Sequence, residues 1–61
     1  LNGLEAKCIE FMVHCFAHRT EYKIPENVLK AMGLILKNIS GNEEARKLIE
    51  VTFNLSVSLN Q

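Results

Sequence analysis

The chain has 61 residues, so it forms one domain at most, and a domain of this length buries only about 60% of the surface that its unfolded form exposes. Hydrophobic residues make up 48% of the sequence, more than three short helices can cover among themselves. We therefore expect some apolar surface to meet a partner or another copy of the chain. Lysine and arginine balance glutamate without forming blocks of one sign, which argues against a nucleic-acid or anionic-membrane surface.

No segment of the sequence reads as a membrane span or a leader. The longest apolar runs fall far short of the roughly 20 residues that a span needs, and the first residues lack a positive region followed by an apolar one. Cys8 and Cys15 lie about 10 Å apart along a predicted helix, too far for a disulfide. They are expected to be reduced thiols in a cytoplasmic or nuclear protein. Because the chain starts without methionine and stops inside a patterned segment, we expect a piece of a longer protein.

The first predicted helix runs from Leu4 to about Arg19 and has a wide apolar face. A helix of this kind is expected to lie between two layers and to be the most buried of the three. The polar connection that follows ends at Ile24, whose position before Pro25 disfavours helical geometry. The apolar face combines one stripe of Leu4, Cys8, Phe11 and Cys15 with a second of Ile9, Met12, Val13 and Phe16.

A second helix is predicted from about Pro25 to Ile39. Proline suits a first helical position because its missing N–H costs nothing there. Gly41 is expected to end this helix with a positive φ, and Asn42 is a good N-cap for a third helix, so the two helices would form a tight hairpin. The apolar face of the second helix, from which we expect Ile35 and Ile39 to enter the core, consists of Val28, Met32, Ile35 and Ile39.

The segment that begins at Glu43 fits two patterns, because helical spacing and strict alternation both continue to Leu59. The β-branched and serine-rich composition after Glu50 favours a strand locally. An isolated strand would lack a partner in an otherwise helical chain, so we predict a helix and an all-α fold. Residues 1–61 would then form a single module, a helical hairpin plus a third helix. The helical positions are Ala45, Leu48, Thr52, Leu55 and Leu59, and the alternating ones are Val51, Phe53, Leu55, Val57 and Leu59.

The sequence AMGLILKNISGNEEARKLI, from Ala31 to Ile49, resembles the junction between armadillo repeats. In that family a long helix ends in Asn-Ile or Asn-Leu and a small residue, and the chain turns into the next repeat through a segment like N-x-E-x-R-x-x-I. The matching asparagine is Asn38, which in the family lines a groove and can hydrogen-bond an extended ligand. Leu34 stands where peptide-binding members often have tryptophan. The resemblance implies a fragment of an armadillo or HEAT-like α-solenoid that acts as a protein-binding scaffold.

Few residues could carry chemistry. His14 and His18 are four residues apart and could share one ion, but Cys8 lies too far along the helix to complete a tetrahedral site with them and Cys15. Adjacent His14 and Cys15 point about 100° apart, which argues against a nucleophile pair. We expect buried thiols with histidines at the edge of the apolar face, and no catalytic residue, metal or cofactor. Gly33 is expected to allow close approach of a neighbouring helix.

These patterns predict a non-enzymatic protein-protein interaction scaffold. Its partner, a protein or peptide, is expected to contact Leu34, Lys37 and Asn38, where the amide orients the ligand and the leucine adds apolar contact. A small helical homodimerisation domain, in which a second copy covers the apolar excess, is the alternative. A zinc-stabilised helical module is a third possibility. No nucleic-acid or membrane partner is expected.

Overall fold

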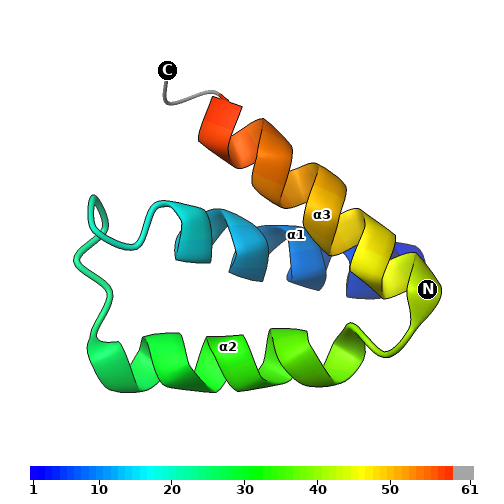
Figure 1. Ribbon diagram of the computed structural model, residues 1–61, viewed down its shortest axis with the longest axis horizontal. Helices are drawn as coiled ribbons and strands as arrows, with labels where there is room; N and C mark the ends of the chain where they lie inside the picture. Colours follow the sequence, from blue (N-terminus) through cyan, green and yellow to red (C-terminus); the bar gives the residue numbers. More distant parts are fainter. Residues whose placement is uncertain (59–61) are drawn as a thin grey trace.

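The computed structural model describes residues 1–58 and consists of three α-helices (Figure 1). They are α1 (Gly3–Ala17), α2 (Glu26–Ile39) and α3 (Glu43–Ser58). The all-α prediction is confirmed, and residues 51–58 are helical rather than extended. The predicted pattern continued to Leu59, which lies outside the described residues. None of the helices in residues 1–58 is long and apolar enough to cross a membrane.

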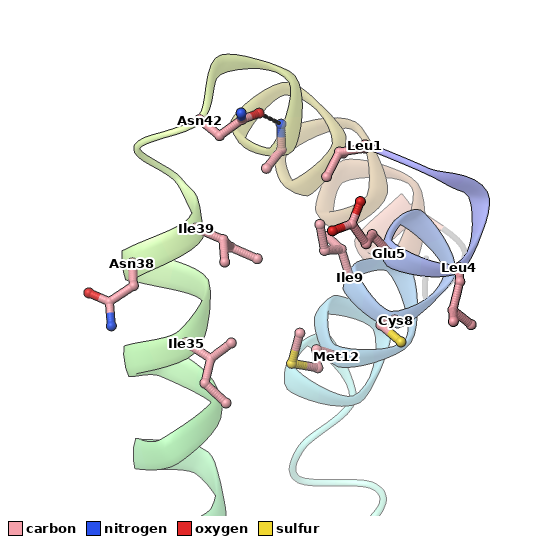
Figure 2. Close-up of a pocket in the computed structure, with 11 residues that line it drawn as sticks. Leu1, Leu4, Glu5, Cys8, Ile9, Met12, Ile35, Asn38, Ile39 and Asn42 are labelled. Carbon is pink, nitrogen blue, oxygen red and sulfur yellow. Dashed lines mark hydrogen bonds between the residues drawn. The ribbon is translucent and has the colours of Figure 1, made fainter.

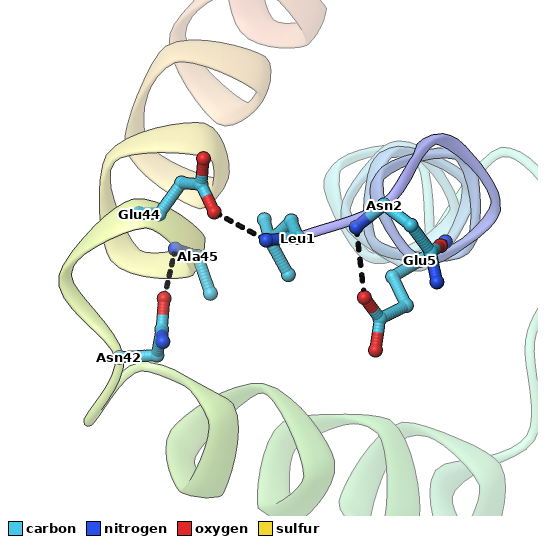
Figure 3. Close-up of polar contacts among 6 residues, drawn as sticks. All are labelled: Leu1, Asn2, Glu5, Asn42, Glu44 and Ala45. Carbon is cyan, nitrogen blue, oxygen red and sulfur yellow. Dashed lines mark hydrogen bonds and ion pairs between the residues drawn. The ribbon is translucent and has the colours of Figure 1, made fainter.

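Helix α1 begins with a capping box that the sequence patterns above did not identify. The Asn2 Oδ1 atom accepts a hydrogen bond from the Glu5 backbone N–H at 2.8 Å, and the Glu5 carboxylate accepts one from the Asn2 N–H at 2.9 Å (Figure 3). Two of the N–H groups that the start of a helix leaves unpaired thereby gain hydrogen bonds, which stabilises the folded chain by about 1 kcal/mol. The helix ends at Ala17, and the His18 N–H donates to the His14 carbonyl at 3.1 Å.

The turn between α2 and α3 is as short as predicted, but its geometry differs. No described glycine has a positive φ, so the expectation for Gly41 is wrong. The turn closes instead through i to i−3 bonds, from the Gly41 N–H to the Asn38 carbonyl at 3.4 Å and from the Asn42 N–H to the Ile39 carbonyl at 3.0 Å. Such a 3₁₀-type closure needs no left-handed residue. The Asn42 cap is confirmed, because its Oδ1 atom accepts from the Ala45 N–H at 3.0 Å (Figure 3).

Helix α1 lies between the other two (Figure 1) and packs more extensively on α3 than on α2. Its predicted central position is therefore confirmed. The buried apolar residues in the described part of the chain are Ile9, Val13 and Ala45. Ile39 packs against them as predicted, together with Leu36, Leu48 and Ile49.

The burial predicted for Ile35 is wrong, since 46% of this residue is exposed, and Val28 is also exposed. Helix α2 contacts α1 more than α3. The side of α2 that is partly covered contains Leu29 and Leu36, rather than the predicted Val28 and Ile35. Val28 and Ile35 lie beside this covered side and stay exposed. Gly33 does face Phe16 of α1, but a Cβ atom there would lie 4.0 Å from the ring, an ordinary contact. Close approach therefore does not require glycine at this position.

Candidate protein-binding surfaces

The predicted partner-binding residues lie on the solvent-facing side of α2. Leu34 is 62% exposed, and Lys37 and Asn38 are also exposed. The Asn38 amide points away from α1 in Figure 2, so it does not enter the core. Its backbone carbonyl accepts from Gly41, which ties this residue to the turn. The three side chains are brought to one exposed region of the molecule, while their role in binding stays a prediction.

The first apolar stripe of α1, which we call the outer stripe, consists of Leu4, Cys8, Phe11 and Cys15. Leu4 is 74% exposed and Phe11 is 68% exposed, Cys8 is exposed and Cys15 is half-buried. The prediction that this stripe belongs to a buried face is therefore wrong. The second stripe is the one that enters the core, because it includes Ile9 and Val13. Helices α2 and α3 each cover one side of α1. The outer stripe lies outside both of these contacts.

A groove of about 470 Å³ lies beside the outer stripe, between α1 and α2 (Figure 2). Ile35 and Ile39 extend from α2 toward α1, where Met12 faces them. The glutamate in the lining already accepts the capping hydrogen bond from Asn2. The lining is mostly apolar and consists of Leu1, Leu4, Glu5, Cys8, Ile9, Met12, Ile35, Asn38, Ile39, Asn42 and Ala45.

Leu1, which lines the groove, forms an ion pair with a distant part of the chain. The Leu1 amino group donates to the Glu44 carboxylate, which holds residue 1 against the first turn of α3 (Figure 3). This hydrogen bond, together with the negative charge of Glu44, raises the pKa of the amino group above its ordinary value of 8.0. The contact joins the starts of α1 and α3.

A ring cluster fixes the connection after α1. The His14 Nε2 atom lies 2.8 Å from the Tyr22 hydroxyl, within hydrogen-bond distance, and the buried His18 ring stacks on Tyr22 with centroids 5.6 Å apart. His18 Nδ1 also lies 3.3 Å from a Glu21 oxygen. The prediction that both histidines lie at the edge of the apolar face is wrong for His18. Tyr22, which the spacing arguments treated as part of a polar connection, contributes to both contacts.

The cysteines and histidines are not grouped as metal ligands in the described residues. Cys8 and Cys15 are free thiols, and Cys8 is exposed rather than buried as predicted. Within residues 1–58 no group of three or more histidine, cysteine, aspartate or glutamate side chains is placed to hold one metal ion. The surfaces described above therefore offer apolar contact and amide hydrogen bonding.

Comparison with known proteins does not assign the chain to a family. No protein-family model matches the sequence, and no curated protein or solved structure is significantly similar to the chain.

Proposed function

We propose that the chain is a non-enzymatic module for protein-protein interaction, of the armadillo or HEAT-like helical type. The observation that carries this proposal is the amount of apolar surface that the fold leaves uncovered. The buried apolar core of the described residues is small, whereas large apolar side chains are exposed on all three helices. Contiguous apolar patches on a protein surface mark sites of association. Binding to another protein is the function that uses this surface.

Helix α3 supports the repeat-like part of the proposal. Its buried line includes Ala45 and Ser56, and exposed apolar pairs with a spacing of four residues flank that line on both sides. In an α-solenoid each helical unit covers its apolar faces against neighbouring units. A helix with apolar residues on both flanks suits that kind of stacking. The two pairs are Val51 with Leu55 and Phe53 with Val57.

The partner-binding region proposed for α2 combines Leu34, Lys37 and Asn38. The exposed Leu34 side chain supplies apolar contact, and the Asn38 amide supplies both a donor and an acceptor for a peptide backbone. Lys37 adds one positive charge and has no ion pair within residues 1–58. This combination suits an extended peptide segment, because a peptide group offers one N–H and one C=O to an amide side chain.

The test uses peptides selected from a random library for binding to the chain. Leu34→Ala and Asn38→Ala should each weaken the binding of selected peptides about tenfold, equivalent to about 1.4 kcal/mol. Leu55→Ala is the matched control, because Leu55 is 61% exposed, close to the value for Leu34, but belongs to α3. Peptides that bind all three variants as tightly as the unchanged chain would contradict the assignment of this region.

A further inference from the structure

The outer stripe of α1 has the spacing of a coiled-coil seam. Leu4, Cys8, Phe11 and Cys15 follow one another at steps of four, three and four residues, which is the repeat that brings apolar residues to one side of a helix for pairing with a second helix. In a coiled coil such a seam is covered by a partner helix. Here α2 and α3 cover other sides of α1, and the seam is largely exposed.

The seam and the groove form one mostly apolar surface. Leu4 and Cys8 belong to both, and Ile35 lines the groove from α2. Val28 is exposed two helical turns before Ile35, on the same side of α2. Glu5 is the charged side chain in the groove lining, where it accepts the capping hydrogen bond from Asn2, and Lys7 lies on the opposite flank of the seam. A largely apolar centre with few charged side chains is typical of the core of a protein interface.

The size of this surface suits a second copy of the chain. Large apolar side chains expose about 150 to 200 Å² when uncovered, so the exposed fractions of Leu4, Phe11, Val28 and Ile35 correspond to about 400 Å² in one copy. A symmetric pair would then cover about 800 Å² from these four positions in both copies, before Cys8, Met12 and the rim are added. Specific interfaces begin near 1,200 Å², so these four positions alone supply about two thirds of the smallest specific interface when the surface meets itself.

We propose that this surface binds a second copy of the chain, with the two α1 helices antiparallel. The two-fold axis passes between Cys8 and Phe11, the middle of the seam. Phe11 of one protomer then lies opposite the partner's Cys8 at the mouth of the groove, and Leu4 lies opposite the partner's Cys15. Each phenyl ring is an aromatic anchor in an apolar pocket, the usual centre of binding energy. The seam lies on α1, whereas Leu34 and Lys37 of the peptide-binding region lie outside the groove lining, so the contact goes beyond the function proposed above.

Sedimentation equilibrium of the 61-residue chain at about 1 mM tests the assembly, because an interface with a dissociation constant of about 100 µM is populated at this concentration. We expect a mass close to twice 6.9 kDa for the unchanged chain. Phe11→Glu should weaken dimerisation at least roughly a hundredfold, because both copies lose their anchor. Leu55→Glu, which places the same charge at a similarly exposed position of α3, should leave the dimer intact.

Thiol oxidation tests the orientation. In a chain carrying Leu4→Cys and Cys8→Ser, the antiparallel arrangement predicts disulfides that join position 4 of one protomer to position 15 of its partner. These positions lie about 16 Å apart within one helix, so the bond cannot form inside one chain. A chain carrying Leu55→Cys and Cys8→Ser is the control and should form no bond between positions 55 and 15.

Several outcomes would overturn the proposal. A monomer at this concentration, or a mass that grows beyond the dimer as concentration rises, would show that the seam does not bind one second copy. Unchanged dimerisation of Phe11→Glu would place the interface elsewhere. Bonds joining position 4 to 4 and 15 to 15, or no bond between 4 and 15, would rule out the antiparallel arrangement. The peptide test remains distinguishable through Leu34, which does not line the groove.

Discussion

Substitution of Val13 by alanine tests which face of α1 enters the core. Val13 is 1% exposed and is the largest fully buried side chain in the described residues. The change removes two methyl groups, each corresponding to about 0.8 kcal/mol of lost burial, and the remaining cavity adds to this loss. We therefore expect a loss of about 2 to 3 kcal/mol. A chain of this size has about 3 to 9 kcal/mol of stability in total, so the loss would be a large part of it.

Urea unfolding followed by far-ultraviolet circular dichroism at one fixed protein concentration measures this loss. Leu55→Ala is the control: it removes a larger part of the side chain, but Leu55 is mostly exposed, so its cost should stay within about 0.5 kcal/mol. If Leu55→Ala proved as costly as Val13→Ala, the packing of α1 against α3 described above would be refuted.

Three further changes test local features. Gly33→Ala should raise the free energy of unfolding by about 0.5 to 1 kcal/mol in urea unfolding, because alanine favours the helix and its Cβ meets the Phe16 ring at an ordinary distance. Tyr22→Phe should lower the free energy of unfolding by about 1 kcal/mol in the same assay, because it removes the hydrogen bond with His14. Because the pKa of the Leu1 amino group is raised, its ion pair contributes its full stabilisation below pH 8. This stabilisation is lost as the pH rises through the raised pKa, and thermal unfolding measured at a series of pH values will detect the loss.

Each of these predictions has its own control. Destabilisation by Gly33→Ala would mean that α1 and α2 approach more closely than described. Tyr22→Phe is compared with Tyr22→Leu, which also removes the ring; a loss of stability seen in Tyr22→Leu but not in Tyr22→Phe would show that the hydroxyl contributes nothing. Acetylation of the Leu1 amino group removes its charge and should abolish the alkaline loss of stability, and a loss that persists would arise from another group.

The fold class and the helix boundaries follow from patterns within single helices. Helical spacing, Pro25 near the start of α2 and the Asn42 cap are local features, and local features place each helix within about two residues. The periodicity of the α3 segment does not decide between a helix and a strand, because both patterns fit. A helix is favoured because a strand would have no neighbouring strand, which is an argument about the whole chain rather than about the segment.

The choice of buried face could not be made from one helix alone. Both apolar stripes of α1 satisfy helical spacing, and the contacts with α2 and α3 decide that Val13 is covered while Phe11 is not. In α2, spacing within the helix alone predicts that Ile35 is in the core. The structure shows instead that Leu36 packs against the core and Ile35 is exposed. The predicted contact residues on α2 proved exposed, but the seam on α1 became visible as a surface when the packing was known.

The account depends most on the claim that apolar residues outside the core form a binding surface. Methyl NMR with a soluble paramagnetic probe measures this directly, at about 20 µM and about 1 mM protein, which lie on either side of a dissociation constant of about 100 µM. We predict that the methyl groups of Leu4 and Ile35 are strongly attenuated in the dilute sample and protected in the concentrated one, while Val13 is protected in both. Attenuation of Leu4 and Ile35 that is equal at the two concentrations would contradict the claim.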